Sequence, residues 1–124
     1  MKNLSIYLLL IISFNSFSKD GCNFSESMCI AQNDYDQADI QLNNTYQRIV
    51  KKIELNEFDD YLVPKNEIKT SLLNSQRAWL KFRDANCEAH YRLFSGGTSR
   101  NEDNLVCLSD MTILRVEQLK KLYL

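Results

Sequence analysis

The run from Gln76 to Cys87, QRAWLKFRDANC, constrains the fold of this chain more than any other segment. It contains no helix breaker, and its Leu, Ala, Arg and Lys residues favour a helix. Trp79 and Phe82 are three residues apart, and they extend a helical stripe that already includes Leu72. The pattern predicts the central helix of a small all-α domain, with Trp79 and Phe82 in its core.

Two further runs share this helical spacing. Apolar residues recur every three or four positions from Ala31 to Ile53 and again from Leu105 to Tyr123. Pro64 suits the first position of the second helix, and the glycine pair at 96–97 marks the turn that follows this helix. The sequence predicts three antiparallel helices, the first beginning near Cys29. The predicted ends are near residues 55–56 and 94–95, and the candidate caps of the third helix are Ser99 and Asn101.

The first 18 residues have the pattern of a secretory signal peptide. Lys2 supplies a positive charge, and residues 4–14 are apolar but fall short of the roughly 20 residues that a membrane span needs. Ser16 and Ser18 are small residues at the positions that a signal peptidase reads. We expect cleavage after Ser18, with an uncleaved anchor as the alternative. Residues 19–124 then form one exported domain without a membrane span.

The charge of the chain gives no indication of nucleic-acid binding. It has 15 Lys and Arg against 16 Asp and Glu, and no basic cluster with interleaved aromatic residues is visible. The acidic residues gather in the first half, where Asp34 and Asp36 lie on the first predicted helix. Such residues form either a solvated helix face or a surface that attracts a basic partner.

Four cysteines in a short exported chain predict two disulfides. In an up-down-up arrangement, Cys29, Cys87 and Cys107 all lie near one pole. Cys87 and Cys107 also lie ten residues either side of Gly97, as a bridge across an antiparallel hairpin requires. We favour Cys87–Cys107 with Cys22–Cys29, although the other two connectivities remain open. The long spacings do not suit a structural zinc site, so no metal is expected.

Three charged residues fall at similar heights along the predicted bundle. Asp39, Arg83 and Arg115 all border apolar stripes, and they lie ten, four and eight residues from the cysteine of their own helix. We predict an internal ion-pair cluster beneath Trp79, in which Asp39 accepts hydrogen bonds from one or both arginines. Such a cluster either fixes the register of the helices or forms a polar surface site that binds a ligand.

No arrangement of residues indicates catalysis. His90 is the single histidine, and the sequence shows neither a partner nor a pocket for proton transfer. The serines have no nucleophile-elbow context, and no pair of carboxylates stands out as an acid–base couple. The chain is therefore expected to be a binding protein without catalytic residues or cofactor.

Three motifs occur in order along the chain. They are Y-x-x-A-D-x-x-L-N-x-x-Y at 35–46, Q-R-A-W-x-x-F-R-D-x-x-C at 76–87 and C-L-x-x-x-T-x-x-R-x-x-x-L at 107–119. In these motifs the chain resembles the LprI-type lysozyme-inhibitor family of bacterial envelope proteins. The resemblance implies a helical, disulfide-bonded, periplasmic or secreted protein that does not catalyse a reaction. It also implies lysozyme, or another envelope protein, as the partner.

Two functions are therefore considered: inhibition of lysozyme, and a non-inhibitory envelope interaction or adaptor module. An inhibitor needs a surface that meets the carboxylate-lined cleft of lysozyme. Asp34 and Asp36 are candidates for steering the encounter, and Arg100 is a candidate for approaching the catalytic carboxylates. These three residues are the predicted contacts.

Overall fold

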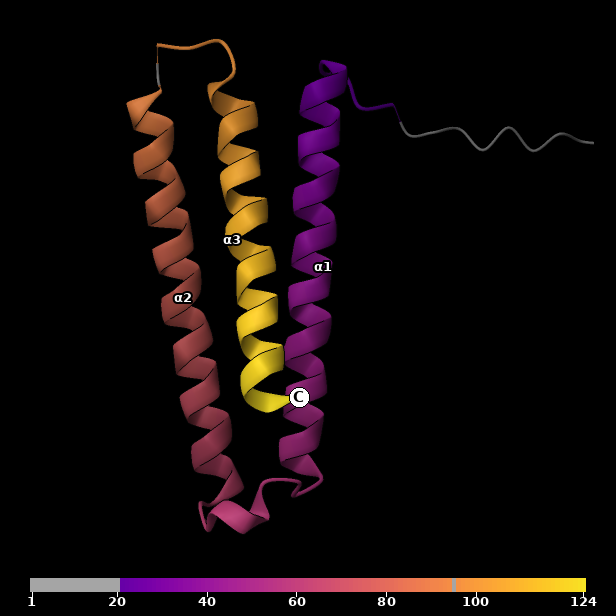
Figure 1. Ribbon diagram of the computed structural model, residues 1–124, viewed down its shortest axis with the longest axis vertical. Helices are drawn as coiled ribbons and strands as arrows, with labels where there is room; N and C mark the ends of the chain where they lie inside the picture. The colour runs from indigo at the N-terminus through magenta and orange to yellow at the C-terminus, as the bar shows by residue number, and fades with distance from the viewer. Residues whose placement is uncertain (1–20, 95) are drawn as a thin grey trace, which may run out of the picture.

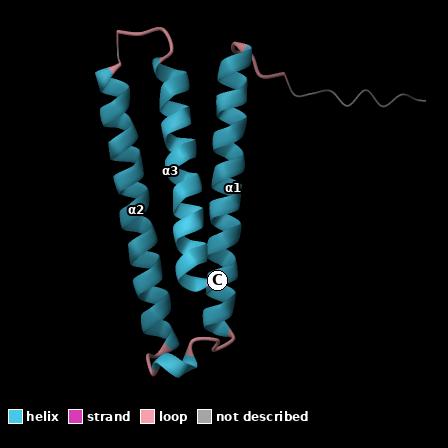
Figure 2. Cartoon of the chain, viewed as in Figure 1, coloured by secondary structure: helices cyan, strands magenta, loops and turns pink. Residues whose placement is uncertain are grey.

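The computed structural model describes residues 21–94 and 96–124, so the predicted signal peptide lies outside the described residues. The described chain is helical, with turns between the helices and no strand (Figure 2). Its elements are α1 (Glu26–Glu54), the short 3₁₀ helix η1 (Asp59–Tyr61), α2 (Lys65–Leu93) and α3 (Arg100–Tyr123). The predicted all-α fold of three helices is confirmed. No helix in the described ranges has the length and apolar character to cross a membrane.

Successive helices run antiparallel, so α1 and α3 point the same way, and α3 lies between the other two in Figure 1. α3 packs most extensively against α1 and less against α2, whereas α1 and α2 touch each other least. The start of α1, the end of α2 and the start of α3 lie at one end of the molecule (Figure 1). We call this end the cysteine pole. Because α1 and α2 are the least-packed pair, side chains between them remain partly open to solvent.

Local capping chemistry sets the helix boundaries. α1 begins at Glu26, before the predicted start, because the Ser25 hydroxyl accepts a hydrogen bond from the Met28 amide at 3.4 Å. Pro64 is the N-cap of α2 rather than its first helical residue. Ser99 is the N-cap of α3 as predicted, but its hydroxyl bonds the Asp103 carboxylate at 2.8 Å instead of a backbone amide.

The main core contains residues of all three helices. Half-buried Trp79 packs against it, as predicted, but Phe82 is 60% exposed and the prediction for Phe82 is wrong. The buried face of α2 continues past Leu72 through polar Gln76 and Arg83, and that line turns Phe82 outward. The buried residues of the main core are Leu42, Ile49, Ile53, Leu72, Val116 and Leu119.

Two disulfides strengthen the cysteine pole. Cys22 pairs with Cys29, and Cys87 pairs with Cys107, each with a Cα–Cα separation of 5.8 Å. This is the predicted connectivity, which is therefore confirmed. Cys87 is completely buried, so the second bridge joins the interior face of α2 to α3. The first bridge instead ties the exposed lead-in segment to the first turn of α1.

At the opposite pole, an ion pair between Lys69 and Glu54 joins α2 to α1. The hydrogen bond from Lys69, together with its positive charge, lowers the pKa of Glu54, and Glu54 in turn raises the pKa of Lys69. A carboxyl whose folded-state pKa is lowered stabilises the fold above its unfolded pKa. That contribution is lost as the pH falls through the folded pKa.

We expect Lys69→Met to raise the pKa of Glu54 towards its ordinary value, as measured by NMR titration of the side-chain carboxyl carbon. Lys65→Met is the control, because Lys65 makes the weakest of the contributions that lower this pKa, and it should raise the value less. Equal rises in the two variants would contradict the assignment of the pKa shift to Lys69.

Candidate functional site

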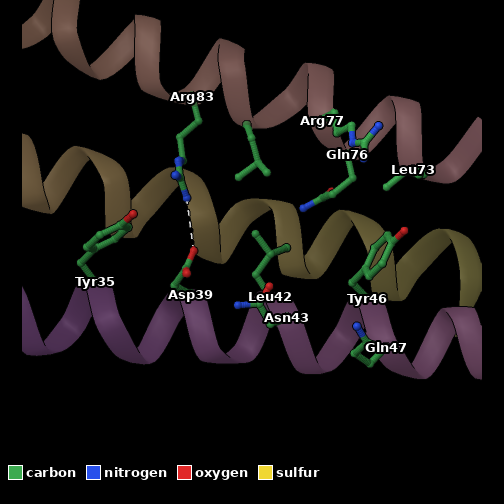
Figure 3. A pocket seen from close by; sticks show the side chains of 11 residues that line it. Tyr35, Asp39, Leu42, Asn43, Tyr46, Gln47, Leu73, Gln76, Arg77 and Arg83 are labelled. Carbon is green, nitrogen blue, oxygen red and sulfur yellow. Dashed lines mark hydrogen bonds and ion pairs between the residues drawn. The ribbon is translucent and has the colours of Figure 1, made fainter.

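Arg83 is the polar centre of the bundle. Only 5% of this residue is exposed, yet it bonds side chains from all three helices. Its Nη1 donates to Asp39 Oδ1 of α1 at 3.4 Å and to Thr112 Oγ1 of α3 at 3.1 Å (Figure 3 draws the Asp39 bond). Its Nε donates to Asp84 Oδ1 at 2.9 Å, within α2 itself. Two carboxylates and a hydroxyl therefore compensate the burial of this guanidinium.

Aromatic rings enclose the same guanidinium. Its central carbon lies 5.6 Å from the Tyr35 ring centre and 5.5 Å from the Trp79 ring centre, both within cation–π range. Arg115 of α3 also lies over Trp79, at 5.7 Å. Trp79, the only tryptophan of the chain, is therefore half-buried and lies against two arginine side chains.

Asp39 pairs with Arg83, one of the two arginines considered as its donors, whereas Arg115 bonds other side chains. Arg115 donates instead to Gln76 Oε1 and Ser75 Oγ of α2, each at 3.1 Å. Gln76 precedes Arg83 by seven residues, or roughly 10 Å along the helix, so Arg115 lies too far down the bundle to share Asp39. Burial lowers the pKa of Arg115, which nevertheless remains cationic.

A groove of about 420 Å³ runs between α1 and α2, with the Asp39–Arg83 pair at one end of it (Figure 3). It exists because these two helices pack together least. It combines tyrosines, side-chain amides and charged groups with a few leucines. The lining residues are Tyr35, Asp39, Leu42, Asn43, Tyr46, Gln47, Leu73, Gln76, Arg77, Leu80 and Arg83.

This groove was not predicted, although the sequence contains two signals for it. Gln76 and Arg83 occupy core positions of α2, where apolar residues are expected. Tyr35, Asp39 and Tyr46 follow one another at helical spacing on α1 and so share one face. Polar residues that continue the buried stripes of two neighbouring helices indicate a polar seam between those helices.

The three predicted partner contacts lie on different surfaces. Asp34 and Asp36 are exposed, but residues two apart project roughly 200° from each other around a helix. Asp36 accepts a hydrogen bond from Gln32 Nε2 at 2.8 Å. Arg100 begins α3 at the cysteine pole, where its guanidinium lies 5.5 Å from the Tyr91 ring centre. They do not form one continuous patch, and their role in binding stays a prediction.

The remaining candidate groups are surface features. His90 is exposed and its ring lies 4.8 Å from that of Phe94, at the end of α2. Within 21–94 and 96–124, no group of three or more His, Cys, Asp or Glu residues could hold a metal ion. What the described residues offer chemically is therefore hydrogen bonding, charge and aromatic surface.

The fold and its polar features define a disulfide-braced, three-helix extracytoplasmic domain, since disulfides of this kind persist in oxidising compartments. The chain matches the family described as "Lysozyme inhibitor LprI" over residues 22–119, and it belongs to this family. The match includes both disulfides and nearly all of the three helices.

A curated relative is an uncharacterized protein of Rhizobium meliloti (strain 1021). It is 34% identical over 96 residues, which cover 74% of this chain and 68% of the relative. No solved structure matches the chain.

Proposed function

We propose that this protein binds lysozyme and inhibits it, acting from the periplasm or after secretion and without catalysing a reaction itself. The observation that carries the proposal is the match to the LprI lysozyme-inhibitor family over residues 22–119. The fold suits an inhibitor, because a braced bundle presents its surface loops with little ordering cost on binding.

The cysteine pole is the surface best suited to the partner. The Cys87–Cys107 bridge holds together the ends of α2 and α3 next to the connecting turn. Leu93 and Phe94 are 76% and 46% exposed just before this turn, and Arg100 follows it. Exposed aromatic and arginine side chains on a rigid support are typical of the residues that dominate binding energy at interfaces. We therefore assign the principal contact to this turn.

Charged side chains of the protein steer its association with lysozyme in the proposed complex. Asp34 and Asp36 lie on the first half of α1, which starts at the same pole. In the proposed complex their negative charges accelerate association with a basic lysozyme, while Arg100 faces the acidic cleft. Inhibition should be stronger at low ionic strength, where charge steering is less screened.

We expect the oxidised protein to slow the clearing of a cell-wall suspension by lysozyme. Arg100→Glu should weaken this inhibition by about 30-fold, which corresponds to an interface residue worth about 2 kcal/mol. Arg48→Glu is the matched control, because it makes the same charge change at an exposed position nearer the opposite end of α1 and should leave inhibition unchanged. The measurement is the inhibition constant at fixed low salt.

Clearing at an undiminished rate with a large molar excess of the protein would overturn the proposed inhibition. If an envelope protein were then captured by the oxidised chain, the adaptor function would be the correct one. Equal losses in the Arg100 and Arg48 variants would show that net charge, and not the cysteine pole, governs binding.

A further inference from the structure

The groove between α1 and α2 contains polar groups that the fold does not use. The side chains of Tyr46, Asn43, Gln47 and Arg77 line it and make no hydrogen bond within the described part of the chain. The Tyr35 ring lies against Arg83, while its hydroxyl likewise has no hydrogen-bond partner among the described residues. These groups are available to a ligand, and the groove volume of about 420 Å³ falls within the range of small-molecule sites.

Gln76 presents a fixed hydrogen-bond donor to the groove. It is 8% exposed, and its Oε1 accepts a hydrogen bond from Arg115 Nε at 3.1 Å. This bond fixes the amide orientation and leaves Nε2 on the other side, where Figure 3 shows it extending into the space between α1 and α2. Nε2 has no acceptor among the described residues. No buried side-chain nitrogen or oxygen of the described residues lacks a partner, so Nε2 reaches solvent in the groove, where it can donate to an acceptor of a ligand.

The lining also defines the chemistry of that ligand. Tyrosine rings and side-chain amides present both donors and acceptors beside apolar surface, which suits the hydroxyl and acetamido groups of an amino sugar. Asp39 is already bonded to Arg83, so it does not compensate Arg77. Arg77 has no ion-pair partner within 21–94 and 96–124, and its planar guanidinium suits a carboxylate.

We propose that the groove between α1 and α2 binds an N-acetylated sugar that carries a carboxylate. Arg77 binds the carboxylate, Gln76 Nε2 donates to the acetamido or ring oxygens, and Tyr46 supplies apolar contact with the pyranose ring. Arg115 is a positioning residue, because it holds the Gln76 amide in the orientation that faces the ligand. The groove lies on the sides of two helices and not on the turn at the cysteine pole, so it is separate from the proposed lysozyme contact.

The test uses the oxidised protein and two sugars that differ in one group. N-acetylmuramic acid carries a carboxylate, whereas N-acetylglucosamine has the same acetamido pyranose without it. In ¹⁵N NMR titrations we expect saturable shifts of the residues lining the groove with N-acetylmuramic acid, and about ten-fold weaker binding of N-acetylglucosamine.

Variants assign the roles within the groove. Arg77→Gln should remove the difference between the two sugars, while Gln76→Met, which keeps the shape but not the donor, should weaken both. Arg92→Gln is the control, since it alters another exposed arginine of α2 outside the groove and should leave both affinities unchanged. A circular dichroism melt of each variant establishes that it is folded.

Equal affinity of the two sugars for the wild-type protein would overturn the proposal, as would the absence of saturable shifts in the groove. If lysozyme instead shifted these same signals while neither sugar did, the groove would be part of a protein interface and the saccharide proposal would be wrong. Because the sugars are tested without lysozyme, this outcome is independent of the inhibition assay.

Discussion

Arg83→Ala is expected to lower the free energy of unfolding by about 3–5 kcal/mol, the range for breaking a buried charge network and emptying a packed site. The substitution removes a guanidinium that lies between the rings of Tyr35 and Trp79. It also leaves the hydroxyl of Thr112, which is completely buried, without the donor at 3.1 Å. Urea unfolding followed by circular dichroism measures the loss.

Two companion variants separate charge from volume in this prediction. Arg83→Met retains most of the side-chain volume and should recover most of the lost stability, because the Asp39 and Asp84 carboxylates left behind are 42% and 61% exposed and can be solvated by water. Asp39→Ala should cost only about 1 kcal/mol, since Arg83 keeps Asp84 and Thr112 as partners and the Asp39 side chain is 42% exposed. If Asp39→Ala were as damaging as Arg83→Ala, the Asp39 bond would be the essential one and this account would fail.

Much of the fold could be predicted because it depends on how apolar residues and turn residues are spaced along the sequence. Helical periodicity identifies three rods, and the turn at 96–97 orders the second and third as a hairpin. Once neighbouring helices are antiparallel, Cys87 and Cys107 can meet across that hairpin, which favours this pairing over the other two connectivities, and the structure joins them. The pairing was predictable because it depends on rise per residue and turn position, not on side-chain packing.

The errors came from features that depend on neighbouring helices. Phe82 is apolar and three residues from Trp79, so periodicity within α2 alone predicted burial. The buried line passes instead through Gln76 and Arg83, whose partners lie on α1 and α3. No spacing rule within a single helix reveals a polar residue that is buried because another helix supplies its hydrogen bonds.

The groove escaped prediction for a related reason. It exists because α1 and α2 pack together least, and the polar residues on their buried stripes indicate a seam between the helices but not how open that seam is. The separation of Asp34 and Asp36, by contrast, follows from the spacing of residues along one helix. Their positions two residues apart place them on different sides of α1.

The two disulfides should differ in their effect on stability. The Cys87–Cys107 bridge spans 20 residues and joins α2 to α3, and chain-entropy estimates for a loop of this length give about 3 kcal/mol. We expect the double substitution Cys87→Ala/Cys107→Ala to lower the melting temperature by about 10–20 °C in a domain of this size. Differential scanning calorimetry of the oxidised variant beside the oxidised wild type measures the shift.

The double substitution Cys22→Ala/Cys29→Ala is the matched control for this effect. Its bridge spans seven residues and ties an exposed lead-in segment to α1, so breaking it frees little of the packed structure. The melting temperature should therefore fall clearly less than after loss of the Cys87–Cys107 bridge. An equal or larger fall would mean that the lead-in segment contributes to the cooperative core. The stability of the cysteine pole would then depend on how α1 begins and not on the hairpin of α2 and α3.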